Sequence, residues 1–94
     1  MSYLITHFYE GGTEEQYQAV VDAVHPAGGL PPGQTYHAAG PTEDGWLIAA
    51  VWDSKDAFDR FSSETLMPAL SNVSGGFSGP PQRRNAEVAN LVTA

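Results

Sequence analysis

The sequence contains no cysteine, and only four of its 94 residues are lysine or arginine. The absence of cysteine excludes a disulfide framework, a thiol nucleophile and a thiolate metal site. No run of about 18 apolar residues is present, so we expect no membrane-spanning helix and no membrane partner. No basic stretch followed by an apolar stretch opens the chain, so we expect no secretory signal and a cytoplasmic location.

Acidic residues outnumber basic ones by 11 to four, which gives a formal net charge of −7. A chain of this charge is repelled by duplex nucleic acid and by anionic lipid at long range. The one basic pair, Arg83-Arg84, is too short to form a nucleic-acid patch. We therefore expect no nucleic-acid partner.

The length and the apolar content predict a single folded domain over residues 1–94. Apolar residues make up 41% of the chain, and its four Phe, four Tyr and two Trp residues need burial, which excludes a disordered chain. A chain of this length leaves no room for a second core and is only marginally stable alone.

Hydrophobic periodicity and turn residues predict six elements in the order β-α-β-β-α-β. In chain order we expect a strand at residues 2–9, a helix at 13–25 that Pro26 stops, strands at 34–39 and 46–52, a second helix from 53 or 54 to 70 that Pro68 kinks or restarts, and a strand at 87–93. This order is typical of the α+β, ferredoxin-like fold. We expect a four-stranded antiparallel sheet in the order 4-1-3-2, with both helices on one face.

The predicted strands are apolar on both faces of the sheet. Along residues 46–52, Trp46, Ile48, Ala50 and Trp52 point one way, while Leu47, Ala49 and Val51 point the other way. Two helices can cover only one face, and monomers rarely leave a large apolar face exposed. We therefore expect a homodimer that forms through the free sheet face, although long loops that fold back over the sheet would also cover it.

The junction between the third strand and the second helix, Val-Trp-Asp-Ser-Lys-Asp-Ala-Phe at residues 51–58, resembles a known family. It is similar to the dimeric α/β barrel superfamily, in its antibiotic-biosynthesis monooxygenase-like branch. The segments GGTEEQY, HAAGP and AFDRF also resemble small actinobacterial members, and the resemblance covers nearly the whole chain. It implies a dimeric barrel and a range of activities, among them cofactor-free oxygenases, haem-degrading enzymes, lactone isomerases and polyketide cyclases.

The chain departs from this family in its second helix. Many oxygenase members carry a histidine shortly after the Ala-Phe pair, where this chain has Phe61. The haem-ligating histidine of the haem-degrading members is also missing from the region around Pro68. We therefore expect no haem and no other cofactor.

Two histidines in predicted strands, His37 and His7, are the candidate catalytic bases. Cofactor-free oxygenation, isomerisation and cyclisation all need a base that removes a proton in a dry pocket. Each histidine could instead be a satisfied core or interface residue. Tyr36, Trp52, Trp46 and Phe61 are the candidate substrate-binding residues, and each of them could equally be a packing residue. His25 we assign to the dipole at the end of its helix.

These residues allow three functions. The first is a cofactor-independent monooxygenase, or a cyclase or isomerase, that acts on a hydrophobic aromatic or polyketide-like small molecule. The second is a non-catalytic dimer that binds such a molecule or regulates through it. The third is a dimer with a filled core that binds protein partners. No histidine pair has metal-ligand spacing, so we expect no metal site.

Overall fold

The computed structural model describes residues 1–25 and 29–94, so the predicted helix stop at Pro26 lies outside the described residues. The elements follow one another as β1 (Tyr3–Glu10), α1 (Glu14–Val24), β2 (Gln34–Pro41), β3 (Gly45–Trp52), α2 (Lys55–Phe61), the π-helical turn η1 (Ser62–Leu66), α3 (Met67–Leu70) and β4 (Gln82–Glu87). No helix in these described ranges is long and apolar enough to cross a bilayer.

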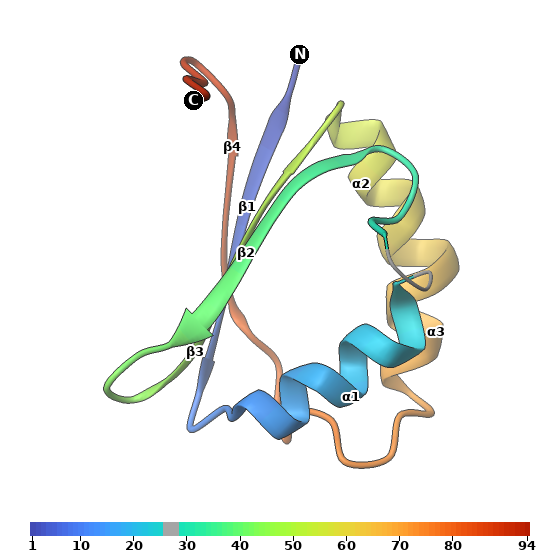
Figure 1. Ribbon diagram of the computed structural model, residues 1–94. Coiled ribbons are helices and arrows are strands. Elements are labelled where there is room, and N and C mark those ends of the chain that lie inside the picture. Colours follow the sequence, from blue (N-terminus) through green and yellow to red (C-terminus); the bar gives the residue numbers. More distant parts are fainter. Residues whose placement is uncertain (26–28) are drawn as a thin grey trace.

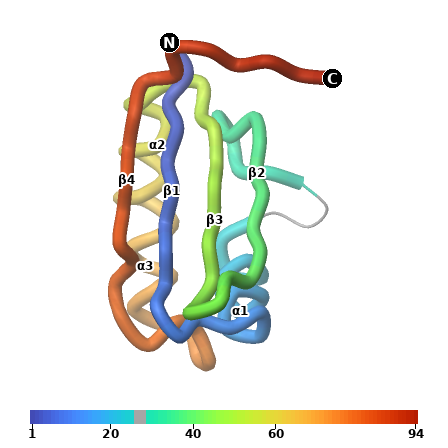
Figure 2. Tube along the Cα trace, turned by 90° about the vertical axis from the view of Figure 1, so that its left-hand side faces the viewer, coloured from blue at the N-terminus to red at the C-terminus, as the bar shows by residue number. Residues whose placement is uncertain are grey.

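The four strands form one antiparallel sheet in the order β2-β3-β1-β4, which confirms the predicted topology. Figure 1 shows the sheet on one side and all helices on the other, so only one face of the sheet is covered. Figure 2 looks onto the uncovered face, with β1 and β3 in the middle and β4 and β2 at the edges.

Side chains alternate along β1 and β3, and this alternation divides the sheet into an inner and an outer face. The inner face carries the buried side chains of the core, which are Tyr3, Ile5, His7, Tyr9, Trp46, Ala50 and Trp52. The register places the following residues on the outer face: Leu4, Thr6, Phe8, Tyr36, Ala38, Gly40, Leu47, Ala49, Val51, Gln82, Arg84 and Ala86. No helix covers the outer face (Figure 1).

Polar caps fix the starts of the two long helices. Thr13 caps α1, where its side chain accepts from the Gln16 backbone N–H and the Gln16 side chain accepts from the Thr13 backbone N–H. Ser54 caps α2 by accepting from the backbone N–H of Ala57. The second helix was predicted to begin at residue 53 or 54, and its N-cap is Ser54.

The second helical segment is not continuous α-helix, as Pro68 predicts. Proline has no N–H to donate, and its ring clashes with the carbonyl four residues earlier. The chain widens into one π-helical turn, in which Met67 N–H donates to the carbonyl of Ser62, and α3 restarts immediately after it. Leu66 in this turn is buried.

The prediction of the fourth strand was wrong in its position. We expected a strand at residues 87–93, but β4 lies at Gln82–Glu87. All six of its residues are exposed. Five of the six are polar or charged, so the sequence lacks the apolar alternation that identifies a strand. It is defined by backbone pairing with β1 instead, and Arg83 and Arg84 lie within the strand rather than in a loop before it.

A steric prediction follows from the start of β3. A methyl group on Gly45 would overlap the backbone carbonyl of Tyr9, whereas a methyl group on Gly40 would meet no atom within 4 Å. We expect Gly45→Ala to lower the free energy of unfolding by about 1–3 kcal/mol, the usual cost of overpacking. Gly40→Ala is the matched control and should stay close to the parent in urea denaturation. Equal stability of the two variants would contradict this register.

Candidate functional site

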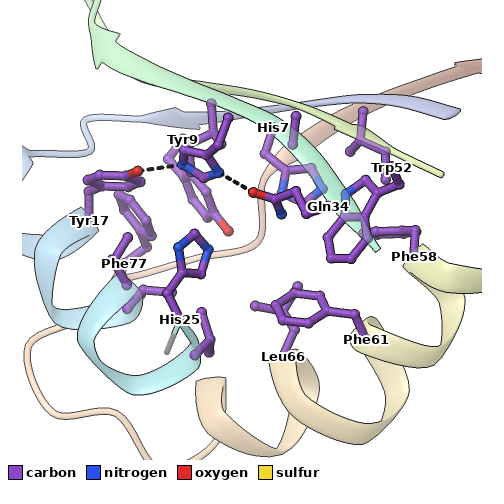
Figure 3. Close-up of a pocket in the computed structure, with 17 residues that line it drawn as sticks. His7, Tyr9, Tyr17, His25, Gln34, Trp52, Phe58, Phe61, Leu66 and Phe77 are labelled. Carbon is purple, nitrogen blue, oxygen red and sulfur yellow. Dashed lines mark hydrogen bonds between the residues drawn. The ribbon is translucent and has the colours of Figure 1, made fainter. Parts of the chain in front are cut away.

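A cavity lies between the inner face of the sheet and the helices (Figure 3). Its volume is about 60 Å³, which is room for a few water molecules. Most of its wall is apolar, and it is lined by Ile5, His7, Tyr9, Tyr17, Val20, Val21, Val24, His25, Gln34, His37, Ile48, Ala50, Trp52, Phe58, Phe61, Leu66 and Phe77. Within residues 1–25 and 29–94, this lining contains three histidines and no Asp, Glu, Lys or Arg.

The polar residues of the cavity come from β1, β2 and α1. His7 points inward because it shares the inner face of β1 with Ile5 and Tyr9. A register irregularity between Gln34 and Tyr36 interrupts the regular pairing of β2 with β3. Both Gln34 and His37 line the cavity, although they are three residues apart and strict alternation would place them on opposite faces.

Three of these residues form a hydrogen-bonded chain, drawn as dashed lines in Figure 3. The Gln34 side-chain oxygen Oε1 can only accept, so His37 Nδ1–H donates to it over 2.8 Å. His37 Nε2 is then the acceptor, and the Tyr17 hydroxyl donates to it over 2.5 Å. The chain therefore holds the imidazole in one tautomer and points the lone pair of Nε2 at the phenol.

Burial keeps the groups of this chain neutral. It lowers the pKa of His37, and the neighbouring His25 lowers it further. The His25 ring stands edge-on to the His37 ring, with their centroids 5.0 Å apart, and burial lowers the pKa of His25 as well. Burial also raises the pKa of Tyr17. Since no carboxylate among the described residues lines the cavity, proton transfer along this chain starts from uncharged groups.

His7 is a second polar group in the cavity, and it makes no hydrogen bond to Tyr17, His37 or Gln34. Burial, and secondly the positive charge of Arg83, lower its pKa from 6.5 to about 4. Its Nε2 atom is buried and makes no hydrogen bond to the residues that the structure describes. His7 is therefore neutral at pH 7, and its Nε2 atom can form one hydrogen bond with a molecule in the cavity.

Aromatic residues form another part of the wall, beside the aliphatic residues of the lining. Trp52 contacts Phe58 edge-on and Phe61 at a tilt, with centroids 5.7 and 4.9 Å away. At the opposite end, Tyr9 and Phe77 stack with centroids 3.7 Å apart and planes 8° from parallel. Phe77 belongs to the segment between α3 and β4, which contains no helix or strand.

The structure brings some of the predicted site residues into the cavity and leaves others out. His37, His7, Trp52 and Phe61 all line it. Trp46 is buried on the inner face and contacts the Tyr17 ring, with centroids 5.2 Å apart, but it does not line the cavity.

Tyr36, a candidate substrate-binding residue, does not line the cavity. It lies on the outer face, where it is 47% exposed. Its neighbour His37 points inward, and adjacent residues of a strand point to opposite faces.

Four cavity residues were missed from the sequence as functional candidates. Tyr17 was given no functional role and His25 was assigned to the helix dipole, yet both line the cavity. Gln34 and Phe77 were given no role. The helical spacing places Tyr17 on one face with Val20, Val21 and Val24, which indicates that it is buried. This spacing does not distinguish a packed phenol from a hydrogen-bonded one.

No model of a protein family matches this chain, and no curated protein matches it. Solved structures do match. Rv0793 from Mycobacterium tuberculosis has a TM-score of 0.72 at 11% identity, over 99% of this chain and 100% of that chain. SnoaB, a cofactor-independent oxygenase from Streptomyces nogalater, has a TM-score of 0.59 at 17% identity, over 99% and 97%.

A third match is a monooxygenase from the gene ActVA-Orf6 of Streptomyces coelicolor, solved in complex with the ligand Nanaomycin D. It has a TM-score of 0.57 at 24% identity, over 99% of this chain and 91% of that chain. These matches confirm that the chain has the ferredoxin-like fold of the monooxygenase-like proteins it was predicted to resemble. At these identities the likeness is one of fold.

The hydrogen-bonded chain predicts the tautomer of His37. We expect nitrogen NMR shifts near neutral pH to show a protonated Nδ1 and an unprotonated Nε2. Gln34→Leu removes the acceptor of Nδ1–H and should mix the two tautomers. Gln18→Leu is the matched control, because the Gln18 side chain is exposed on α1 and donates its hydrogen bond to Asp22, away from the cavity. A Gln34→Leu spectrum identical to that of the parent would contradict the assignment.

The lowered pKa of His7 predicts a loss of stability in mild acid. The unfolded chain binds a proton on this histidine near pH 6.5, but the folded chain does so only near pH 4. The contribution of neutral His7 to the free energy of unfolding is therefore complete above pH 6.5. It is lost as the pH falls towards 4, by roughly 2–3 kcal/mol. Urea denaturation of the parent and of His7→Phe across this range measures it, and the variant should show the smaller loss. Parallel curves would rule out a buried neutral His7.

Proposed function

We propose that this protein is a cofactor-independent enzyme, in first place a monooxygenase, that acts on a hydrophobic aromatic molecule with an acidic hydroxyl group. The observation that carries this proposal is the hydrogen-bonded chain Tyr17–His37–Gln34 in an apolar cavity. Oxygenation without a cofactor requires a substrate that becomes an electron-rich anion, a base that produces the anion, and a site that excludes water.

The Tyr17 oxygen can relay a proton because it keeps a free lone pair while its hydroxyl donates to His37. A substrate phenol or enol that donates to this oxygen would transfer its proton as Tyr17 transfers its own to Nε2. Gln34 would stabilise the resulting imidazolium through the Nδ1–H bond. The substrate anion can then donate an electron to dioxygen, and the two radicals combine at carbon to form a peroxide. The peroxide takes up the proton that His37 received, its O–O bond breaks and water leaves, so that a carbon that carried two hydrogen atoms becomes a carbonyl.

The same proton transfer also serves the cyclase or isomerase chemistry that we considered, in which the anion attacks or reprotonates at carbon without using oxygen. The matches in fold favour the oxygenase, since SnoaB is a cofactor-independent oxygenase and the ActVA-Orf6 protein is a monooxygenase. The complex of the latter with Nanaomycin D supports an aromatic ligand for this fold. Neutral His7 would hold a second oxygen of the substrate.

The cavity of about 60 Å³ is smaller than the roughly 300–1,000 Å³ of small-molecule sites. A multi-ring substrate must therefore displace part of the wall. We propose that Phe77 moves, because it is carried by a segment without helix or strand. It stacks on Tyr9 and lies only partly buried at the edge of the Val20, Val24 and Leu66 cluster. The walls packed by Trp52 and Phe58 belong to the buried core and would stay in place.

Exposed apolar side chains on the outer face support our proposal of a homodimer. Leu47 is 41% exposed and Tyr36 is 47% exposed on this face. Packing a second copy against it removes these apolar groups from water, which is favourable by roughly 25 cal/mol per Å² of apolar surface. We propose a two-fold dimer that packs sheet against sheet and works in the cytoplasm.

Turnover of phenolic aromatics tests the enzyme. We expect oxygen consumption and a quinone product that has gained one oxygen atom and lost two hydrogen atoms, because the second oxygen atom leaves as water; mass spectrometry detects it against a panel of hydroxynaphthalenes and hydroxyanthrones. Tyr17→Phe and His37→Gln should each lower kcat by about 100-fold or more, the usual contribution of a general base. Tyr36→Phe is the matched control, because it removes a hydroxyl outside the cavity.

Product of unchanged mass would indicate the cyclase or isomerase instead. Saturable binding without any product would indicate the non-catalytic binding module. Full activity of both Tyr17→Phe and His37→Gln would overturn the proposed base.

Sedimentation velocity tests the dimer. Leu47→Asp places a charge on the outer face and should convert a dimer into a protomer at micromolar concentration. Met67→Asp is the matched control, since Met67 is 55% exposed on α3 and lies away from the sheet. A parent protein that sediments as a protomer throughout would refute the sheet-to-sheet packing.

A further inference from the structure

A groove open to solvent lies beside the cavity, between the start of β2 and the segment formed by α2 and η1. Its volume is about 310 Å³, so it is several times larger than the cavity. Phe61 lines both spaces, so its ring separates the groove from the cavity. Figure 3 shows Phe61 on the side of the cavity away from Phe77, so the groove and Phe77 lie at opposite ends of the cavity.

A change of rotamer at Phe61 would connect the two spaces. The side chain is only partly buried, and it packs at the margin of two core clusters, one around Trp52 and one around Leu66. A ring at the margin of a cluster has fewer neighbours to displace than a ring at its centre. A molecule in the cavity that carries a substituent on its rings can therefore extend into the groove beside Phe61.

Three polar side chains without a partner in the described part of the chain line the groove. Arg60, Glu64 and Thr65 are all exposed, and the ion pair of this helical segment joins Lys55 and Asp59 instead. The guanidinium can only donate hydrogen bonds, the carboxylate can only accept them, and the hydroxyl can do both. Glu64 and Thr65 belong to the π-helical turn η1, and such turns are frequent at functional sites.

The charges of the groove favour a neutral, hydroxylated group over an ion. Arg60 and Glu64 carry opposite charges four residues apart, so their fields largely cancel for an incoming ion, and the net charge of −7 further disfavours an anion. A hydroxyl group donates and accepts, so neighbouring hydroxyls can bond to the guanidinium and to the carboxylate at the same time. Phe61 and Pro32 add apolar surface for the carbon–hydrogen face of a sugar ring.

We propose that the aromatic substrate carries a sugar and that this groove binds it, with Arg60 donating to the sugar hydroxyls and Glu64 accepting from them. This inference rests on the proposed function, because it requires the aromatic rings to lie in the cavity. It adds the substituent that distinguishes the substrate from a bare phenol, with the phenol on the inner side of Phe61 and the sugar on the outer side.

Binding of quinones tests the sugar site without turnover, because their rings have no remaining carbon to oxidise to a carbonyl. Isothermal titration calorimetry would compare a dihydroxyanthraquinone, its O-glucoside and its carboxylic acid. We expect the glucoside to bind about tenfold or more tightly than the parent quinone, since its hydroxyls bond to charged groups. Arg60→Ala and Glu64→Ala should each remove this preference and leave the affinity for the parent quinone unchanged. Lys55→Ala is the matched control, because Lys55 lies on the same helix but outside the groove.

The other outcomes separate the sugar site from the proposed function. Equal affinity of the parent protein for the quinone and its glucoside would overturn the sugar site and leave the cavity as a site for aromatic molecules. Tightest binding of the carboxylic acid, lost in Arg60→Ala and kept in Glu64→Ala, would also overturn it, because the groove would then be an anion site. Failure of all three quinones to bind would overturn the sugar site and the aromatic site together.

Discussion

The alternation of side chains along β1 and β3 is the constraint on which the rest of the structure depends. It places Ile5, His7, Ala50 and Trp52 on the face that the helices cover, and so creates both the core and the cavity from the same strands. A shift of one residue in either strand would exchange the two faces. The site can therefore not be separated from the core, and a variant that weakens the pairing of β1 with β3 affects both.

The site combines apolar walls with a few polar groups that are almost fully satisfied by one another. Gln34 orients His37, and His37 accepts from Tyr17, so each side chain of this hydrogen-bonded series fixes the orientation of the next. Buried networks of this kind are favourable only when every member has its partner. His7 stands apart, since its Nε2 has no partner in the described part of the chain, and it is the group most available to a bound molecule.

The sequence allowed the fold to be predicted almost completely, because the strong signals are local. The capping box at Thr13, the apolar residues of β3 and the proline at position 68 each act on their own few residues. β4 was misplaced because its residues carry no apolar pattern, while Leu91 and Val92 just after it are apolar but exposed. Where a strand is defined by its neighbour, periodicity does not locate it.

The site was predictable only in part, for a different reason. Strand parity gives His7 the same face as Ile5 and Tyr9, and in the structure His37 lies on that side of the sheet too. Nothing in the sequence shows that β2 is irregular between Gln34 and Tyr36. That irregularity lets two residues at an odd spacing share the cavity. The role of Tyr17 depends on its hydrogen bond to His37 in β2, and the two residues are 20 positions apart in the chain. Such a contact exists only once the tertiary structure has formed.

The absence of carboxylates from the described cavity lining has a consequence for the medium in which the protein works. A proton that moves from a bound molecule to His37 creates one cation and one anion inside the same wall, and the total charge of the protein with its ligand does not change. Mobile ions in the solvent reach such an enclosed pair poorly. Ionic strength should therefore hardly alter the proton transfer itself, even though this acidic protein responds to dissolved salt over the rest of its surface.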